Sequence, residues 1–114
     1  MSESDEDWGL RAGLLLKELG FSNQDISYRY LTAALKMMMG GALPGPEMWL
    51  AIGGWYGKQN ETVRGACRRS IRTAYERDPV NFCNSLDDLY FTPPRLREFL
   101  VIASKWLRQR YSPK

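Results

Sequence analysis

The sequence contains no histidine and only two cysteines, Cys67 and Cys83, among its 114 residues. Without histidine, the commonest general base and the nucleophilic triads that depend on it are missing. No P-loop, GxGxxG or paired-carboxylate pattern takes their place. The two isolated cysteines are too few to hold zinc and are expected to be small buried side chains. The chain is therefore predicted not to be an enzyme and to use no metal, cofactor or small-molecule substrate.

Long apolar runs are also absent, which excludes a membrane span, and no signal-peptide pattern is present. Apolar residues make up 44% and charged residues 25% of the chain, as in a folded soluble domain. A chain of 114 residues can bury a core as one domain. These features predict a cytoplasmic protein without membrane contact.

No segment alternates apolar and polar residues with period two, so strands are not expected. Apolar spacing, prolines and glycines instead predict an all-α domain of six helices joined by short connectors. The predicted ranges are 7–19, 22–39, 46–56, 61–77, 79–89 and 93–110. Ser22, Asn60, Asp78 and Thr92 are the residue types that cap helices, and they precede or begin four of these ranges.

Charge is distributed unevenly along the chain. Residues 1–7 are acidic and are expected to form a flexible tail, whereas residues 8–114 form the helical domain. This body carries 16 basic against 9 acidic residues. Such an excess predicts binding to a polyanion without specifying which one.

The predicted fourth helix, 61–77, has two distinct sides. Seven small or apolar residues form one continuous face: Val63, Ala66, Cys67, Ser70, Ile71, Ala74 and Tyr75. This face is expected to be buried. Away from it lie Arg64, Arg68, Arg69 and Arg72, and no acidic residue occurs between Glu61 and Glu76 to pair with them. This pattern is consistent with polyanion binding and with an ordinary solvated face. It favours polyanion binding.

The segment before this helix favours DNA as the polyanion. An amphipathic, glycine-rich helix followed by the short turn "GKQN" and a basic helix is typical of a helix-turn-helix. In that motif the second helix enters the major groove. Arg68 is predicted to contact guanine, while Arg69, Arg72 and Lys58 are better placed for phosphates. The predicted DNA-binding residues are Lys58, Gln59, Asn60, Thr62, Arg64, Gly65, Arg68, Arg69 and Arg72.

Three blocks of the sequence match one known pattern. In residues 52–75 the matching positions are Ile52, Tyr56, Val63, Ala66, Arg68, Ile71 and Ala74. In residues 18–35 they are Glu18, Gly20, Tyr28, Tyr30, Leu31 and Ala34, and near the end they are Pro94, Glu98 and Phe99. With these blocks the chain resembles the C-terminal DNA-binding (effector) domain of the sporulation-initiation response regulator family (Spo-zero-A type) of Firmicutes.

The resemblance implies a six-helix fold that binds double-stranded DNA as a transcriptional regulator, as a homodimer on tandem sites, and is nucleoid-associated when bound. Arg68 alone carries over as a basic residue that faces DNA. Two positions that contact the groove in the family hold Arg64 and Gly65 here, so the family's target sequence is not expected. The receiver domain of the family has no counterpart in this chain.

A second interpretation belongs to another class of function. The Arg64–Gly65 change and the stock of aromatic residues, with four tryptophans, are also consistent with a protein-interaction module. In that case a helix-turn-helix scaffold has lost or altered its DNA binding, and exposed aromatic side chains form the contact surface.

Overall fold

Six α-helices account for the regular structure of residues 5–111, the part of the chain that the computed structural model describes, and no strand occurs there. The helices are α1 (Asp5–Leu19), α2 (Ile26–Met39), α3 (Pro46–Tyr56), α4 (Asn60–Arg77), α5 (Pro79–Leu86) and α6 (Leu96–Tyr111). The prediction of an all-α domain with six helices is confirmed.

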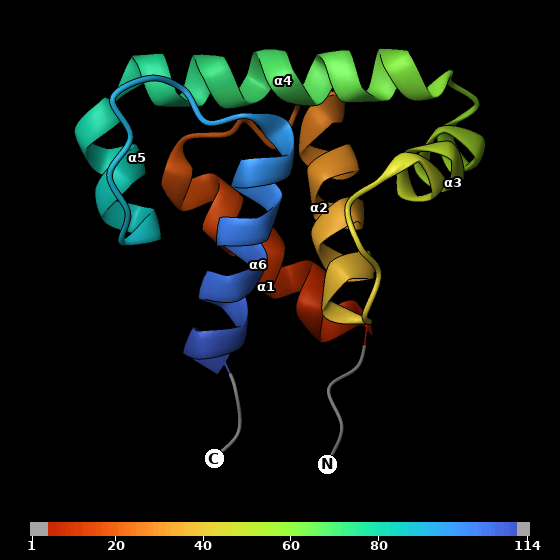
Figure 1. The fold of residues 1–114 in the computed structure, drawn as a ribbon, viewed down its shortest axis with the longest axis horizontal. Helices are drawn as coiled ribbons and strands as arrows, with labels where there is room; N and C mark the ends of the chain where they lie inside the picture. Colours follow the sequence, from red (N-terminus) through yellow and green to blue (C-terminus); the bar gives the residue numbers. More distant parts are fainter. Residues whose placement is uncertain (1–4, 112–114) are drawn as a thin grey trace.

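The longest helix, α4, lies across one end of the molecule, and the other helices are gathered on one side of it (Figure 1). The N-terminal ends of α2 and α6 both point toward α4, while α3 and α5 lie at its two ends (Figure 1). The radius of gyration is 13.3 Å, the value expected for a compact domain of this length. One side of α4 thus covers the core and the other faces away from the molecule.

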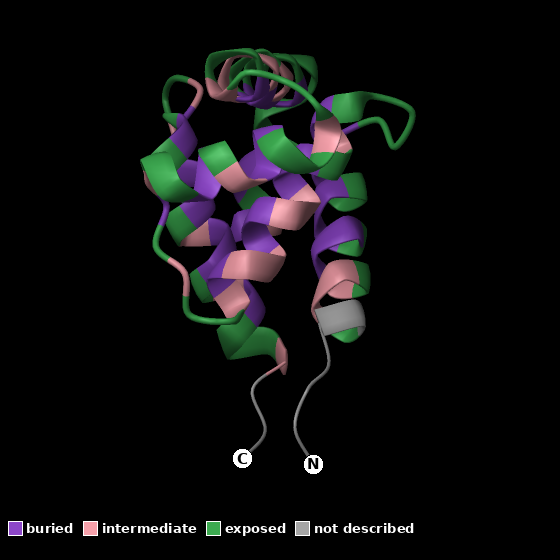
Figure 2. Cartoon of the chain, turned by 90° about the vertical axis from the view of Figure 1, so that its right-hand side faces the viewer, coloured by how far each residue is buried: buried purple, intermediate pink, exposed green. Residues whose placement is uncertain are grey.

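The core lies between the six helices, and the buried parts of each helix face inward (Figure 2). Aromatic side chains join distant elements within it. Phe82 of α5 lies 5.9 Å from Phe99 of α6 and 5.6 Å from Tyr75 of α4, measured between ring centroids. Such ring pairs add to the stabilisation from apolar burial. These ring contacts fix the position of α4 relative to α5 and α6.

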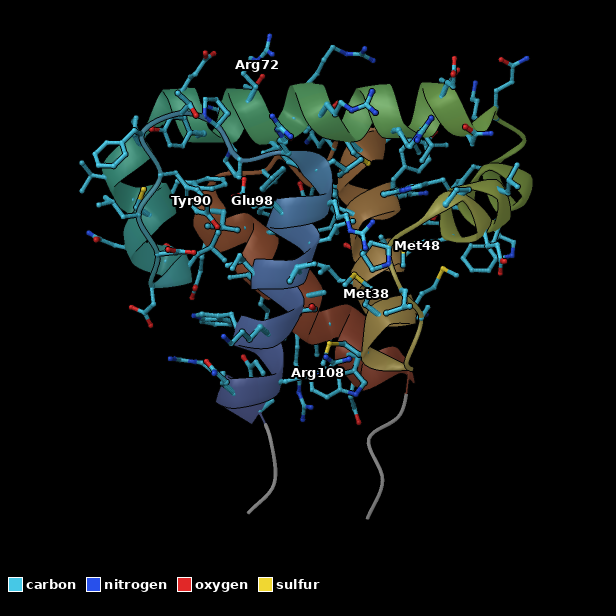
Figure 3. The ribbon with its side chains drawn as sticks, in the orientation of Figure 1. Met38, Met48, Arg72, Tyr90, Glu98 and Arg108 are labelled. Atoms are coloured by element: carbon cyan, nitrogen blue, oxygen red, sulfur yellow. The ribbon has the colours of Figure 1, made fainter. Side chains whose placement is uncertain are left out.

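Polar side chains also fasten helix ends to backbone carbonyl groups. Arg108 of α6 donates a hydrogen bond to the carbonyl oxygen of Met38, at the end of α2, over 2.8 Å (Figure 3). Asn81 of α5 donates to the carbonyl oxygen of Glu18 over 2.8 Å. These bonds satisfy carbonyl groups that the last turns of α2 and α1 leave without intrahelical donors.

The predicted boundaries of α5 and α1 agree only in part with the structure. Asp78 caps α5 as predicted, since its carboxylate accepts a hydrogen bond from the Asn81 backbone N–H over 3.1 Å. That helix ends at Leu86 rather than at residue 89, because Asp87 adopts the left-handed conformation with φ 54°. The helix α1 begins at Asp5, so residues 5–7 of the predicted acidic tail are helical. Residues 1–4 of that tail lie outside the described part.

The predicted capping roles of Ser22 and Thr92 are wrong. Ser22 accepts a hydrogen bond from the Gln24 N–H in a local turn, and α2 begins only at Ile26. After Thr92, the Pro93–Pro94 pair delays α6 to Leu96, because a residue that precedes proline is disfavoured in the helical conformation.

Four large apolar residues in or near the helices are exposed: Ile26, Trp55, Val80 and Leu89. Ile26 and Val80 lie in the first turns of their helices, and Leu89 lies beyond the end of α5. Trp55 lies on the outer side of α3, of which the buried residues are Met48, Trp49, Ile52 and Gly53. Apolar spacing alone could not show where the neighbouring helices end.

Candidate nucleic-acid interface

The turn between α3 and α4 consists of residues 57–59 and is held by its own backbone. Gly57 takes the left-handed conformation with φ 65°, and the Lys58 N–H donates to the Gly53 carbonyl oxygen over 2.8 Å. A Cβ atom at Gly53 would lie only 2.5 Å from the Lys58 carbonyl oxygen, whereas one at Gly54 would meet nothing within 4 Å. The backbone of the turn therefore approaches α3 closely at Gly53 and not at Gly54.

Three predicted DNA-binding residues lie in this turn and at the first position of α4. Lys58 and Gln59 are exposed and Asn60 is half-buried. Asn60 was expected to cap the helix, but it is the first helical residue, and Gln59 takes the capping position without a side-chain hydrogen bond. The N-terminal N–H groups of α4 thus have no side-chain cap.

The inward side of α4 agrees with the sequence pattern. Val63, Cys67, Ile71, Ala74 and Tyr75 are buried, and Ala66 and Ser70 are half-buried beside them. Burial raises the pKa of the Cys67 thiol to about 12, so this cysteine is a protonated core residue and not a reactive one.

The side of α4 that faces away from the core carries Thr62, Gly65 and Arg69. Thr62 and Arg69 are exposed. A Cβ atom at Gly65 would lie 3.3 Å from a terminal guanidinium nitrogen of Arg69. The missing side chain at Gly65 therefore leaves room for the Arg69 side chain to lie back along the helix.

Arg64, Arg68 and Arg72 form a ridge on the edge of α4 that adjoins α6. Arg68 and Arg72 are exposed and Arg64 is half-buried. Figure 3 shows Arg72 on the side of α4 that faces away from the other helices. The Nε atom of Arg64 is buried and has no hydrogen-bond partner. Arg64 and Arg68 were predicted to lie opposite the buried face, yet they lie one position after Val63 and Cys67 and so flank it, whereas Arg72 lies farther out.

Two adjoining hollows separate this ridge from the start of α6. The smaller has a volume of about 220 Å³ and the larger about 570 Å³. Arg68, Leu96 and Arg97 line both of them. Arg64 belongs to the smaller hollow, and Arg72 to the larger. We call the two together the α4–α6 groove.

Among the side chains of residues 7–111, no carboxylate forms an ion pair with Arg64, Arg68, Arg72 or Arg97 of the α4–α6 groove. Glu76 lines the larger hollow but not the smaller. Positive charge thus gathers at this edge of α4 without a local counter-charge, which is typical of a site for an external anion.

The sequence pattern did not identify Arg97, nor Arg95, which lines the larger hollow. Both follow the Pro93–Pro94 pair, and two basic residues at the start of a helix are a pattern that the sequence does contain. Its meaning depends on α6 pointing toward α4, which local sequence does not show.

Exposed apolar side chains gather near the other end of α4. Trp55 is 62% exposed. Leu50 is also exposed and lines a hollow of about 550 Å³ with Gly54, Lys58 and Glu61. This part of α3 is an apolar patch beside the predicted DNA-binding turn.

No protein-family model, curated protein or solved structure matches this chain. Within residues 5–111, none of the helices combines the length and apolar character needed to cross a bilayer. The described side chains, those of residues 7–111, include no cluster of three or more from His, Cys, Asp or Glu able to hold a metal ion.

Proposed function

We propose that this chain is a sequence-specific transcriptional regulator that binds double-stranded DNA with α4 in the major groove. It acts in the cytoplasm, on the nucleoid, and needs no cofactor. One observation carries the proposal: α4 presents Arg64, Arg68, Arg69 and Arg72 with no ion pair to any of them among the side chains of residues 7–111. Unpartnered arginines on a helix repel one another unless an anion faces them.

The short turn before α4 supports the interpretation of α3, the turn and α4 as a helix-turn-helix. Residues 57–59 connect two helices, and Gly53 allows the turn to pack directly on α3. The second helix of such a pair can enter the groove because it protrudes from the domain. Because α4 lies across one end of the molecule, its outer side is accessible in the same way (Figure 1).

The geometry leads us to divide the DNA contacts differently from the sequence alone. Arg69 and Thr62 lie opposite the buried residues of α4, so we assign them to base edges. Arg68 and Arg72 lie along one edge of the helix, where the phosphates of one DNA strand would run. Lys58 in the turn is assigned to phosphates as before. The resemblance to the sporulation regulators also leads us to propose a homodimer on tandem sites.

Titration of duplex DNA at several salt concentrations tests the function. The logarithm of the affinity is expected to fall linearly with the logarithm of the salt concentration, with a slope near −0.9 for each phosphate neutralised. Selection of bound duplexes from a random pool gives the preferred sequence and the half-site spacing. Absence of binding at low salt, or a pool without any enriched sequence, overturns the proposal.

Three arginine variants test the division of contacts. Arg69→Ala is expected to relax the base preference at one position, where a bidentate arginine–guanine contact contributes about 1–3 kcal/mol. Arg68→Ala and Arg72→Ala are expected to weaken all sequences alike. Lys105→Ala, on an exposed site of α6 away from the groove, is the matched control. If Arg68→Ala alone relaxes the preference, the assignment from sequence is correct instead.

The exposed patch around Trp55 and Leu50 supports one other function, a protein-interaction module on this scaffold. A partner would then cover the outer side of α3. The variant Trp55→Ser separates the two functions. Its DNA affinity is expected to stay within about twofold of the wild-type value, because Trp55 is uncharged and neutralises no phosphate. The interaction module is favoured if the wild-type chain binds a defined, purified partner that Trp55→Ser no longer binds, and if neither chain binds DNA.

A further inference from the structure

The smaller hollow of the α4–α6 groove has the composition of an anion site. Arg64 and Arg68 reach it from α4, and Arg97 reaches it from the first turn of α6. We propose that this hollow binds a phosphate group through these three guanidinium groups. The inference rests on the proposed function in one respect: in the DNA complex, the phosphate belongs to the backbone at the edge of the major groove.

The Arg64 side chain carries an unsatisfied donor. Its Nε atom is buried and makes no hydrogen bond, although Arg64 lines the hollow. A buried charged donor without an acceptor is costly, and native structures rarely leave one so. A phosphate oxygen in the hollow supplies the missing acceptor, because phosphate offers several oxygens to planar guanidinium groups.

The orientation of α6 also favours an anion in the hollow. Its N-terminal end points toward α4 (Figure 1). The backbone N–H groups of Leu96 and Arg97 belong to the first turn and therefore lack intrahelical acceptors. The partial positive charge at a helix N-terminus favours an anion. This charge adds to the three arginines, and it does not carry the proposal by itself.

No acidic residue lines the hollow. Apart from the three arginines, its lining consists of apolar residues and glycine, including Pro44, Trp49 and Leu100. Two acidic residues of this region have other positions: Glu76 lines only the larger hollow, and Glu98 accepts a hydrogen bond from the Arg95 N–H over 3.2 Å. Low-polarity walls strengthen the attraction between arginines and an anion.

The size of the hollow limits what it accepts. Its volume of about 220 Å³ lies below the roughly 300–1,000 Å³ of sites for drug-sized ligands. A phosphate group enters, and the remainder of the phosphate ester extends into the larger hollow or away from the protein. The ester is then either the DNA backbone or a free phosphorylated small molecule.

Trp49 provides a probe of the hollow that does not depend on DNA. Its side chain is buried against the hollow, whereas Trp8, Trp55 and Trp106 do not line it. We suggest titrating the full chain with inorganic pyrophosphate at constant ionic strength, and following the four indole N–H signals by NMR. The Trp49 signal is expected to shift and saturate while the other three stay in place. Equal, non-saturating shifts of all four signals overturn the proposal.

Charge-matched variants test which residues hold the anion. Arg97→Gln is expected to weaken pyrophosphate binding about tenfold or more, the loss of one charge-assisted hydrogen bond. Lys105→Gln removes the same charge from an exposed site on α6 outside the hollow, and is expected to change binding less than about twofold. Arg64→Gln gives a second variant should Arg97→Gln unfold. Equal effects of Arg97→Gln and Lys105→Gln refute the site.

Duplex DNA distinguishes the two sources of phosphate. If the backbone occupies the hollow, Arg97→Gln lowers the affinity for every sequence and reduces the salt slope by about 0.9, without changing base preference. Pyrophosphate then competes with DNA. If the wild-type chain binds DNA and Arg97→Gln leaves the affinity and slope unchanged, the DNA part of the inference fails while the proposed function stands. If the Trp49 signal responds but no DNA binds, the site stands for a free phosphate ester and the proposed function fails.

Discussion

The two edges of α4 differ in the size of their side chains. On the edge toward α2, Ala66 and Ser70 are small, and the Ser70 hydroxyl forms a hydrogen bond with the hydroxyl of Ser27, which is buried in the first turn of α2. On the edge toward α6, Arg64 and Arg68 are long and charged. The helix α4 accordingly packs closely against α2 and only lightly against α6.

Both neighbouring helices point their N-terminal ends at α4 (Figure 1). Small residues let one of these ends pack directly on α4, whereas arginines keep the other apart and leave the α4–α6 groove between. Side-chain size on one helix thus decides which neighbouring helix packs into the core and which one borders a groove.

The largest expected effect comes from enlarging the close-packed edge. Ser70→Leu is expected to lower the free energy of unfolding by about 3 kcal/mol, since overpacking costs about 1–3 kcal/mol and the buried Ser27 hydroxyl loses its partner. Urea denaturation measures this. The matched change on the other edge, Arg68→Leu, is expected to stay within about 0.5 kcal/mol because that site is exposed. Similar losses at both edges would contradict the comparison.

A change that displaces the turn before α4 is expected to shift the start of this helix, and with it both edges. Gly53→Ala is expected to cost about 2 kcal/mol, because its Cβ would lie 2.5 Å from the Lys58 carbonyl oxygen and the turn must shift. Gly54→Ala, one residue on, meets nothing within 4 Å and is expected to stabilise by up to about 1 kcal/mol through helix propensity. Denaturation of this pair of variants checks both signs. A stabilising Gly53→Ala would show that the turn is not tightly held.

The outer side of α4, between the two edges, tolerates a methyl group. Gly65→Ala is expected to raise the free energy of unfolding by about 0.5–1 kcal/mol, the propensity difference in a helix interior. The added Cβ would lie 3.3 Å from the end of the flexible Arg69 side chain, which can move. Thermal denaturation measures the gain. A loss of stability would mean that the position of Arg69 over Gly65 is itself stabilising.

The buried side of α4 titrates only at high pH. The Cys67 thiol has its pKa raised from 9.0 to about 12 by burial, so the folded state holds its proton where the unfolded state loses it. Stability from this group is complete below pH 9 and falls as the pH rises toward 12. Between pH 8 and pH 9.5 the expected loss is about 0.8 kcal/mol. Urea denaturation of the wild type and Cys67→Ala at both pH values gives the difference, and parallel losses would contradict it.

Much of the fold follows from the sequence. Prolines and glycines mark the connectors, and apolar spacing marks the buried residues of α4, because both depend on chain geometry within a few residues. The errors at Ser22 and Thr92 occur where local alternatives compete: a serine can form a turn as well as a cap, and a proline pair can delay a helix.

The candidate site was only partly predictable. The arginines of α4 were identified from the lack of nearby acidic residues, which is a property of one helix. Arg97 and the unsatisfied Nε atom of Arg64 were not, because they acquire meaning only when α6 meets α4. The assignment of Arg69 rather than Arg68 to base edges likewise depends on which side of α4 the neighbouring helices cover.

The sequence by itself determined an all-α chain, the positions of its connectors, and a fourth helix with one apolar side and four arginines. These follow from contacts between residues close along the chain. Only the tertiary structure decided that α4 lies across the ends of α2 and α6, and that Arg64, Arg68 and Arg97 surround one hollow. That arrangement arises from packing between helices about 30 residues apart along the chain, where side-chain size and helix ends, rather than local preference, set the geometry.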